Sequence, residues 1–407
     1  MLQYFTFENQ KIKSLVAKRY QTNCMHIKLI INEPYAFQVA GHSRENSHKF
    51  EILKDQARAL IYKSFQDCSR GMREVIFYER VFSPDASEAF KLLRQFIPMY
   101  HGIFQCPSTK AYYVGLSDLV ASFKQPNVCD FKMGTITYLP GSSEDKISRE
   151  KFKYAWRRKL GFLLSGMQVY DPRTHCMIKL PKAFGRNLNP EQVYSVGLKT
   201  FLGPDPVYRV ELAHKYLIQL SRILHWYKEY GAERLTFCRS SLLFIHESVA
   251  SGCEESPPSN NNTTNTTTAN TTTTTNGLRV VSTKLIEKSN RINNSQLLIP
   301  STTNATPINV AKSNCINGSN TRAQVYLIDF AHWEEKIPHS SMSAAVATTS
   351  PPRLTSKTHI NDNNAAEDGE EADDSSYYIT YELTEGFRYG LETLISLMQR
   401  VVNNGEN

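Results

Sequence analysis

The sequence predicts an α+β protein, because short apolar runs that resemble strands alternate with longer segments of helical periodicity. The strand-like runs are Ala59–Lys63, the run that ends near Gly134, Leu242–His246 and Gln324–Phe330. The clearest helical segment lies between Pro206 and Gly231. A chain of 407 residues, 41% of them hydrophobic, is long enough to bury one large core or two smaller ones.

The first mixed region runs from Phe37 to about Leu116. Within it, Ala59–Lys63 is predicted to be a short strand that ends on a lysine. In the following segment, Arg73–Phe82, apolar residues recur at helical intervals, which predicts a helix that carries Glu74. The sequence therefore predicts a strand lysine followed closely by a helical glutamate.

The next strand is predicted to end in Pro-Asn-Val-Cys-Asp-Phe-Lys-Met-Gly, residues 126–134. Asp130 and Lys132 are two residues apart, and such residues point to the same face of a strand, so we expect both to face one cleft. This pair can hold a nucleotide on one side and a phosphorylated acceptor on the other. The alternative is a surface ion pair beside a turn.

The helix between Pro206 and Gly231 has apolar residues at alternating spacings of three and four, with Gly231 as its C-terminal stop. We expect this stripe in the core: Val210, Ala213, Leu217, Leu220, Leu224 and Tyr227. Leu242–His246 and Gln324–Phe330 are expected to pair as strands. The chain closes with a predicted helix whose apolar stripe is Leu391, Leu394, Ile395 and Met398.

Two polar tracts interrupt the second half of the chain. Asn260–Asn276 consists of Asn and Thr except for Ala269 and cannot bury enough apolar surface to order itself, so we expect a loop insertion. The tract from about Pro338 to Ser376 is expected to be a second insertion. Its acidic run is expected to be solvated, with an interaction site as the alternative.

Composition limits the function classes. The formal net charge of +8 suits a polyanionic ligand such as a nucleotide, an inositol phosphate or an acidic lipid headgroup, and no nucleic-acid partner is expected. The eight cysteines include no Cys-x-x-Cys pair, which favours a reducing compartment over a zinc site or disulfide framework. We find no apolar run of about 18 residues and no signal-peptide core, so we expect a cytoplasmic and nuclear protein without a transmembrane segment.

Five short motifs occur in the order in which they occur in the inositol polyphosphate kinases, a family that this sequence resembles. They are Gln-Val-Ala-Gly-His at 38–42, Pro-x-x-x-Asp-x-Lys-x-Gly at 126–134, Ser-Ser-Leu-Leu-Phe at 240–244, Ile-Asp-Phe-Ala-His at 328–332 and Gly-Phe-Arg-Tyr-Gly-Leu at 386–391. The chain lacks a Walker A motif, a His-Arg-Asp loop and a Gly-x-Gly-x-x-Gly motif, so an ordinary P-loop enzyme or protein kinase is not expected.

Spacing favours the multikinase branch of the family. Trisphosphate 3-kinases carry a long helical insertion after the Asp-x-Lys motif, whereas only a short stretch separates Gly134 from Leu160 here. Hexakisphosphate kinases usually open with Gln-Val-Gly-Gly-His and lack the Arg70-Gly71 stretch, which this chain has. Met133-Gly134-Thr135 and residues 166–170 do resemble the hexakisphosphate kinases, which remain the alternative.

The resemblance implies a bilobed architecture, with a protein-kinase-like N-terminal lobe on an antiparallel sheet and a larger C-terminal lobe. The lobes are expected at 37–116 and 117–248, with a short inositol-binding insert at about 140–190. The remaining segments are an N-terminal extension of unknown role at 1–36, a low-complexity insertion at 249–320, a metal-binding strand at 321–337, a polar and acidic insertion at 338–377, and the C-terminal helix at 378–407.

The resemblance also assigns roles around ATP and Mg²⁺. Lys63, supported by Glu74, would bind the ATP phosphates, and Asp329 would carry Mg²⁺ with Ser241 near the metal. Asp130 would lie near the ribose. Lys132 would lie at the reactive hydroxyl of the acceptor, where an ammonium offsets developing charge. Ser117 stands where the family usually has an acidic hinge residue, so adenine is expected to contact the backbone of Ser117 and Leu119.

Substrate contacts are expected from cations that can bind phosphates. In addition to Lys132, the resemblance places Arg70, Lys146, Arg149, Lys153 and His332 at the acceptor. Arg149 and Glu150 replace polar amides of the family, which could alter which inositol phosphate fits. Arg157, Arg158 and Lys159 are expected to form a solvated basic face.

These assignments imply ATP-dependent and Mg²⁺-dependent phosphorylation of inositol trisphosphate and tetrakisphosphate toward pentakisphosphate. Phosphoinositide headgroups at a membrane surface are a further candidate acceptor. The alternatives are a hexakisphosphate kinase, a trisphosphate 3-kinase, or a catalytically silent scaffold that binds inositol phosphates.

Overall fold

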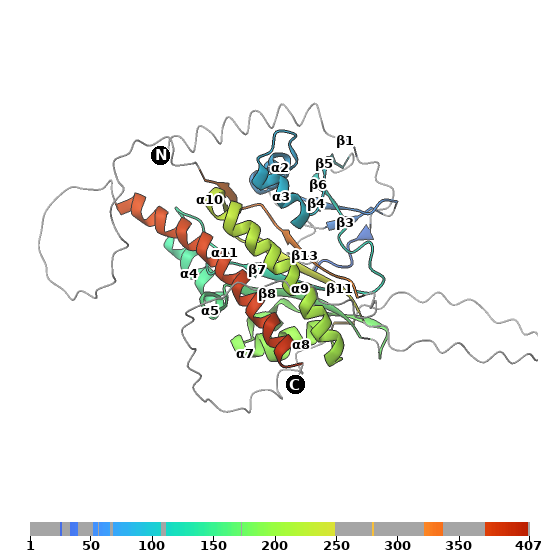
Figure 1. The fold of residues 1–407 in the computed structure, drawn as a ribbon. Coiled ribbons are helices and arrows are strands. Elements are labelled where there is room, and N and C mark those ends of the chain that lie inside the picture. The colour runs from blue at the N-terminus through green and yellow to red at the C-terminus, as the bar shows by residue number, and fades with distance from the viewer. Residues whose placement is uncertain are drawn as a thin grey trace, which may run out of the picture.

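The computed structural model describes residues 25–26, 33–39, 52–55, 57–65, 68–106, 111–171, 173–248, 279–280, 321–336 and 371–405. These residues form two six-stranded sheets and one two-stranded sheet, with helices packed around them (Figure 1). The predicted α+β class is confirmed. The tracts at 260–276 and 338–370, and residues 40–42 of the first motif, lie outside the described residues.

The first sheet has the strand order β1-β5-β6-β4-β3-β2. Its strands are β1 (Met25–His26), β2 (Glu33–Pro34), β3 (Ile52–Lys54), β4 (Leu60–Ser64), β5 (Tyr100–Gln105) and β6 (Tyr112–Ser117). All neighbouring strands pair antiparallel except β1 and β5. The predicted strand at 59–63 is β4, and β1 and β2 show that this sheet already includes residues of the segment 1–36.

Helix α2 (Cys68–Phe82) follows β4 and contains the predicted helix at 73–82. It leads into α3 (Glu88–Leu93) and the 3₁₀ turn Arg94–Phe96. The inner face of α2 is buried at Val75, Phe77 and Tyr78. Phe77 stacks on Phe330, with ring centroids 3.7 Å apart, so α2 connects the first sheet to the strand segment that carries Asp329.

The second sheet has the order β12-β9-β8-β7-β11-β13. Its strands are β7 (Pro126–Met133), β8 (Phe162–Asp171), β9 (Cys176–Leu180), β11 (Ser241–Glu247), β12 (Arg279–Val280) and β13 (Ala323–Ile328). The predicted pairing of 242–246 with 324–330 is confirmed, since β11 and β13 run antiparallel with Ser241 opposite Ile328. β12 lies within the segment 249–320 and pairs parallel with β9.

Shorter elements connect the strands of the second sheet. They are α4 (Glu144–Phe152), α5 (Arg157–Leu160), α6 (Lys182–Arg186), α7 (Pro190–Gln192), the π-helical segment Val193–Leu198, α8 (Lys199–Leu202), and the small sheet of β10 (Leu235–Phe237) with β14 (Trp333–Glu335). Helices α4 and α5 lie in the insert predicted at 140–190. The first residues of α4 are Glu144 and Asp145, which suit the positive N-terminal end of a helix.

The long helix α9 (Pro206–Trp226) is capped at its N-terminus by Asp205, whose side chain accepts a hydrogen bond from the Tyr208 N–H. The prediction that Gly231 stops the helix is wrong. The chain stays helical through the π-helical segment Tyr227–Gly231 and α10 (Ala232–Arg234), and Gly231 has a right-handed φ of −79°. A Cβ there would lie 2.8 Å from the Tyr227 ring, so close packing explains this glycine.

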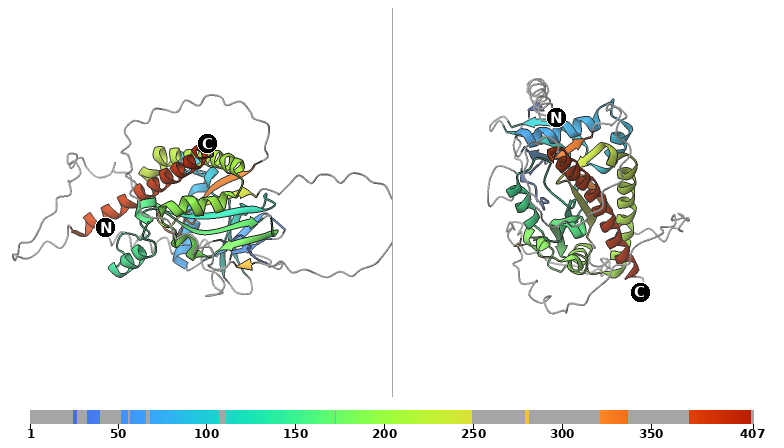
Figure 2. Two further views of the ribbon diagram at one scale, coloured as in Figure 1. Left: turned by 90° about the horizontal axis from the view of Figure 1, so that it is seen from below. Right: turned by 90° about the vertical axis from the view of Figure 1, so that its left-hand side faces the viewer.

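The apolar stripe of α9 is only partly as predicted. Ala213, Leu220 and Tyr227 are buried, whereas Val210, Leu217 and Leu224 are half-buried at the edge of the core. The other buried positions are Leu212, Tyr216, Ile223 and Trp226. The buried face is wider because α9 packs against both β13 and α11 (Glu371–Asn403), the helix beside it in Figures 1 and 2.

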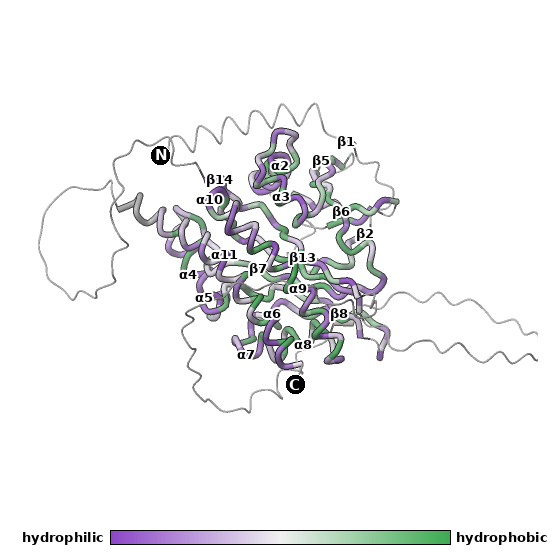
Figure 3. The backbone as a smooth tube through the Cα atoms, in the orientation of Figure 1, coloured by the Kyte–Doolittle hydropathy of each residue, from purple (hydrophilic) through white to green (hydrophobic). Residues whose placement is uncertain are grey.

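Helix α11 begins at Glu371, earlier than the boundary of 378 that the sequence suggests, so it includes the end of the acidic tract. Leu391, Leu394 and Met398 of its predicted stripe are buried. Hydrophobic and hydrophilic positions alternate along α9 and α11 in Figure 3, as expected for helices with one face in the core. Within the described residues no helix is long and apolar enough to cross a membrane.

Candidate active site

A cavity lies between the two six-stranded sheets. Its wall includes Lys63 from β4, Glu74 from α2, Ser117 at the end of β6, Asp130 from β7 and Asp329 just after β13. The remaining lining residues are Tyr35, Phe37, Gln38, Val39, Ile52, Ile61, Ser64, Tyr78, Pro98, Leu116, Leu119, Leu243 and Ile328. The six residues that the sequence assigns to the nucleotide, far apart in the chain, therefore line one cavity.

Lys63 of β4 contacts two carboxylates, one from helix α2 and one from the turn after β13. Its Nζ lies 2.8 Å from Glu74 Oε1 and 2.6 Å from Asp329 Oδ1. Burial alone would lower the pKa of Lys63, but Asp329 and Glu74 outweigh burial and raise it, so the ammonium is charged at neutral pH. Glu74 is almost fully buried, whereas the Asp329 side chain is 36% exposed to the cavity. Glu74 can therefore hold Lys63 while Asp329 remains accessible to a ligand.

Asp329 has a left-handed backbone, with φ of +66°. Few residues other than glycine adopt this conformation, and aspartate is among those that tolerate it. Burial would raise the pKa of the Asp329 carboxyl, but Lys63 and Lys132 hold it below its ordinary value. The side chain is therefore an ionised carboxylate held at a turn that ends β13.

Asp130 and Lys132 occupy alternate positions of β7, opposite Leu243 and Ser241 of β11. The Asp130 carboxylate accepts a hydrogen bond of 2.5 Å from Ser165 Oγ. Burial raises the pKa of Asp130, an effect that Lys132 opposes. Lys132 Nζ donates to Arg239 O at 3.2 Å. The cavity lining includes Asp130 but not Lys132, so the common cleft stays a prediction, although the Lys132 charge acts on both Asp130 and Asp329.

The residues fit a divalent cation bound together with a nucleotide. Mg²⁺ in phosphoryl-transfer sites takes one or two carboxylates, phosphate oxygens and water rather than a cage of protein ligands. Asp329 offers such a carboxylate, and Ser241 opposes Ile328 one residue away. The Ser240 hydroxyl is buried and has no hydrogen-bond partner among the described residues, and the Ser241 hydroxyl lies beside the Asp130 carboxylate, whose pKa it lowers. In the same ranges no group of three or more His, Cys, Asp and Glu could hold a metal alone.

At the other end of the cavity, the main-chain prediction is corrected in part. The Ser117 N–H already donates to Met99 O at 3.0 Å, so it is not available to an adenine ring. The Leu119 N–H has no partner within the described chain. The Asp118 carboxylate is held by other parts of the chain, because it accepts hydrogen bonds from Tyr35 Oη at 2.6 Å and from the Val120 N–H. Tyr35 and Leu119 therefore both line the cavity at this end.

A second group of charges surrounds His332, next to Asp329. Burial, together with the charges of Arg239, Arg70, Arg73 and Lys146, lowers the pKa of His332 to about 4. His332 Nδ1 is buried without a partner among the described residues. We call Arg70, Arg73, Lys132, Lys146 and Arg239 the cation cluster. These five side chains come from α2, β7, α4 and the turn before β11, and such a set suits a polyanion.

The structure separates the other predicted substrate residues. Arg70 and Lys146 belong to the cation cluster. Lys153 bonds Glu150 Oε1 at 2.6 Å on the rim of the site. Arg149 is exposed and donates to Asp145 O of its own helix, so the structure does not bring it to the cluster.

The expectation for the basic run at 157–159 is wrong for one residue. Arg157 is only 7% exposed, and its Nη1 donates to Lys132 O at 3.2 Å and Gly134 O at 3.1 Å. Burial lowers its pKa to about 10. Arg158 and Lys159 are exposed as expected. Arg157 therefore supports the backbone around Lys132 instead of facing solvent.

Sequence reasoning missed Arg239 and Arg73. Arg239 directly precedes the Ser-Ser-Leu-Leu-Phe motif, and its φ of +63° turns the chain into β11. Its side chain donates to Thr137 O and to Glu150. Arg73 lies three residues after Arg70, which places both on one face of α2. Two signals in the sequence could have indicated these residues. Arg239 lies directly before a family motif, and Arg73 lies at helical spacing from Arg70.

A lysine held by a helical glutamate, an aspartate beside it and a neighbouring cluster of cations are the parts of a phosphotransferase site. The sequence profile of the inositol polyphosphate kinase family matches residues 113–353, more than half of the chain. The chain therefore belongs to the inositol polyphosphate kinase family, whose members are phosphotransferases with an alcohol acceptor.

Several curated relatives are similar to the chain. Human inositol polyphosphate multikinase is 31% identical over 216 residues, which cover 53% of this chain and 51% of the relative. Multikinase alpha of Arabidopsis thaliana is 27% identical over 234 residues, covering 54% and 80%. Mouse inositol hexakisphosphate kinase 3 is 32% identical over 146 residues, covering 35% and 36%. The match spans about half the length of the human relative.

Among solved structures, the chain is similar to the inositol phosphate multikinase of S. cerevisiae, determined in complex with ADP and Mn²⁺. The two share 18% sequence identity with a TM-score of 0.46, over 84% of this chain and 98% of the other.

Proposed function

We propose that this protein transfers the γ-phosphoryl group of ATP to hydroxyl groups of inositol trisphosphate and tetrakisphosphate, with pentakisphosphate as the end product. The observation that carries the proposal is the adjacency of two sites. Six residues predicted to bind a nucleotide line one cavity, and the cation cluster lies near it, around His332, which is three residues after Asp329. The multikinase relatives support this choice of acceptor.

The roles follow from charge and position. Lys63, held by Glu74, would bind the nucleotide phosphates. Asp329 would hold Mg²⁺, which supplies positive charge to the phosphates when bound. Lys132 would stabilise the charge that develops as the acceptor oxygen attacks the γ-phosphorus and the bond to ADP breaks. The cation cluster would orient the acceptor through its phosphates.

Phosphoinositide headgroups are a further proposed acceptor, since they present the same ring phosphates. For the cell, we propose a cytoplasmic and nuclear location. The match to hexakisphosphate kinase 3 keeps that activity as the second candidate.

The test incubates the purified protein with Mg²⁺-ATP and inositol 1,4,5-trisphosphate and resolves the products by charge, with Lys132→Ala as the control. Stepwise conversion to pentakisphosphate supports the proposal. Arrest at tetrakisphosphate would favour a 3-kinase, and a pyrophosphate formed only from hexakisphosphate would favour the second candidate. Binding of inositol phosphate without turnover would indicate a scaffold.

A further inference from the structure

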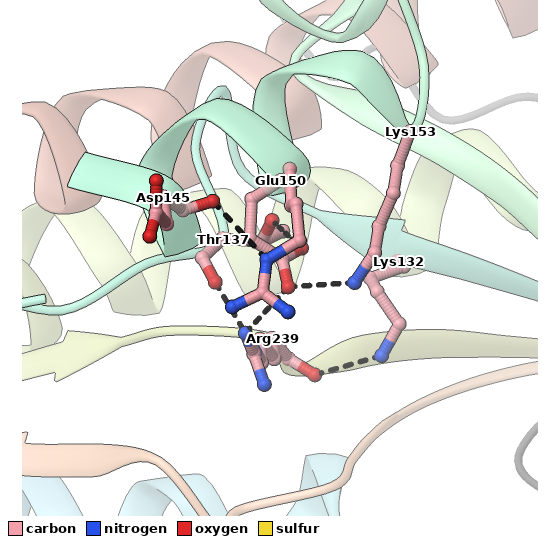
Figure 4. A network of polar contacts seen from close by, with 7 residues as sticks. Lys132, Thr137, Asp145, Glu150, Lys153 and Arg239 are labelled. Carbon is pink, nitrogen blue, oxygen red and sulfur yellow. Dashed lines mark hydrogen bonds and ion pairs between the residues drawn. The ribbon is translucent and has the colours of Figure 1, made fainter. Parts of the chain in front are cut away.

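The carboxylate of Glu150 pairs with two cations beside the proposed acceptor site, Lys153 and Arg239. Glu150 is on the last turn of α4, and its side chain is 10% exposed. Its Oε1 lies 2.6 Å from Lys153 Nζ and 2.9 Å from Arg239 Nη2. Its Oε2 accepts from Thr137 Oγ1 at 2.8 Å. Figure 4 shows these side chains converging, with Lys132 bonded to the carbonyl of the same Arg239.

This carboxylate is ionised at neutral pH. Burial alone would raise the pKa of Glu150, but the hydrogen bonds from Lys153 and Thr137, together with the Arg239 charge, lower it below its ordinary value. The anion therefore offsets the charge of two cations that would otherwise be available to a phosphate. An acceptor phosphate at this place must displace Glu150 or accept its repulsion.

We propose that Glu150 is a specificity-determining residue of the acceptor site, which disfavours acceptors that carry a phosphate at the Lys153–Arg239 position and favours those with a hydroxyl there. This inference rests on the proposed function, because it requires an inositol phosphate in the cation cluster. A hydroxyl can donate to the carboxylate, whereas a phosphate cannot be placed beside it without like-charge repulsion.

The test compares Glu150→Gln with Glu144→Gln. Glutamine keeps the length of Glu150 and one acceptor oxygen, replaces the other oxygen with an NH2 donor that Thr137 Oγ1 can accept from, and removes the charge. Glu144 is exposed on the first turn of the same helix, and no ion pair of it occurs among the described residues. The control therefore removes the same charge from α4 without releasing Lys153 or Arg239.

Affinities for inositol hexakisphosphate and inositol 1,4,5-trisphosphate are measured by calorimetry, with no nucleotide present. We expect Glu150→Gln to bind hexakisphosphate about tenfold more tightly than wild type, the size expected for one partly solvated charge contact. Trisphosphate affinity should change by less than about threefold, and Glu144→Gln should match wild type. In turnover assays with acceptors that keep a free hydroxyl, the change should lower KM for inositol tetrakisphosphate more than for trisphosphate and should leave kcat unchanged.

A role limited to holding α4 in place predicts a different result. Glu150→Gln would then weaken both ligands alike and lower the melting temperature, and the ratio of the two affinities would not change. If Glu150→Gln is folded and its ratio of hexakisphosphate to trisphosphate affinity equals that of wild type, the proposal is overturned.

A double-mutant cycle with Lys153 gives a second test of the proposal. In the background of Lys153→Gln, the additional Glu150→Gln change should gain less for hexakisphosphate than it does in wild type, because one released cation is absent. Equal gains would also overturn the proposal. If wild type binds neither inositol phosphate, the proposed function fails first; if wild type binds and phosphorylates but the ratio is constant, only the role of Glu150 fails.

Discussion

At the scale of single residues, Asp329 combines an unusual backbone with the charges of the site. Its positive φ places the carboxylate at the end of β13 against Lys63, where it is partly exposed to the cavity. Strained backbone of this kind concentrates at functional sites, because the surrounding structure must stabilise it. The stacked pair of Phe77 and Phe330 holds the next residue of the chain.

Asp329→Asn should therefore abolish turnover while leaving the fold intact. The amide has nearly the same shape but cannot neutralise a cation, and we expect kcat to fall by about a thousandfold or more. Rates are measured in saturating Mg²⁺, with circular dichroism and thermal melting as controls for folding. Turnover near the wild-type rate would contradict the metal role of Asp329.

His246 is a buried histidine away from the cavity. Its ring nitrogens contact Asn127 Nδ2 at 3.1 Å and Tyr216 Oη at 3.0 Å, and burial lowers its pKa to about 3. The unfolded chain binds a proton on this histidine near pH 6.5, whereas the folded chain does not until about pH 3. Stability should therefore be lost as the pH falls from about 6.5 toward 3.

The slope expected from one such histidine is about 1.4 kcal/mol per pH unit within this window. Denaturant unfolding of wild type and His246→Gln between pH 7.5 and 4.5 measures it. Carboxylates contribute to the pH dependence of unfolding free energy in both proteins. The contribution of His246 is therefore the slope of the wild-type curve minus the slope of the His246→Gln curve. Parallel curves would mean that His246 titrates normally in the folded state.

At the scale of elements, α11 crosses the end of β7 at a contact of two glycines. A Cβ on Gly390 would lie 2.2 Å from Gly161 O and 2.9 Å from Met133 Cε. The backbone oxygen cannot move aside without shifting the turn between α5 and β8. The helix therefore approaches the strand that carries Asp130 and Lys132 only because both positions lack side chains.

Gly390→Ala should destabilise the protein by about 1–3 kcal/mol through overpacking, although alanine is the better helix former. Ser396→Ala, at an exposed position of the same helix, is the matched control and should change stability by less than about 0.5 kcal/mol. Denaturant unfolding of the two variants gives the comparison. A Gly390→Ala protein as stable as wild type would show that the contact relaxes freely.

The elements also show how far sequence could predict this molecule. Periodicity located β4, α2, α9, β11 and β13, because each buries one face in its local segment. It placed the edge of the α9 stripe wrongly, since the second neighbour of α9 is α11, far along the chain. Arg157 was assigned to the surface by its charged neighbours, but three-dimensional contacts to Lys132 O and Gly134 O decide its burial.

In the candidate site too, local patterns could be predicted from the sequence and long-range contacts could not. Motifs gave Asp130, Lys132 and Asp329, and the predicted strand at 59–63 with the family resemblance gave Lys63. The structure gathers the four around one region. Arg239 was missed because its function depends on a turn conformation and on partners in α4 that no local pattern encodes. The sequence assigned an adenine contact to the backbone of Ser117, but the Ser117 N–H already donates a hydrogen bond to Met99 O.

At the scale of the whole molecule, the cavity that we propose binds the nucleotide is shared by the two large sheets. Lys63 and Ser117 belong to the first sheet, and Asp130 and Leu243 belong to the second. A ligand in the cavity must therefore contact both. Because such a ligand binds only the folded arrangement, it stabilises the protein by about 2.7 kcal/mol at a concentration of 100 Kd.

Hydrogen exchange tests this arrangement directly. A non-hydrolysable ATP analogue with Mg²⁺ should slow exchange in peptides that cover both β4 at 60–64 and β7 at 126–133, since local opening on either side of the cavity now requires ligand release. Peptides from the end of α11 at 396–403 serve as the control, because none of their residues lines the cavity. Lys63→Met should remove the protection of both strands together, because its ammonium bonds carboxylates on each side. Protection confined to one sheet would mean that the nucleotide binds one lobe alone and that the cavity between the sheets is not its site.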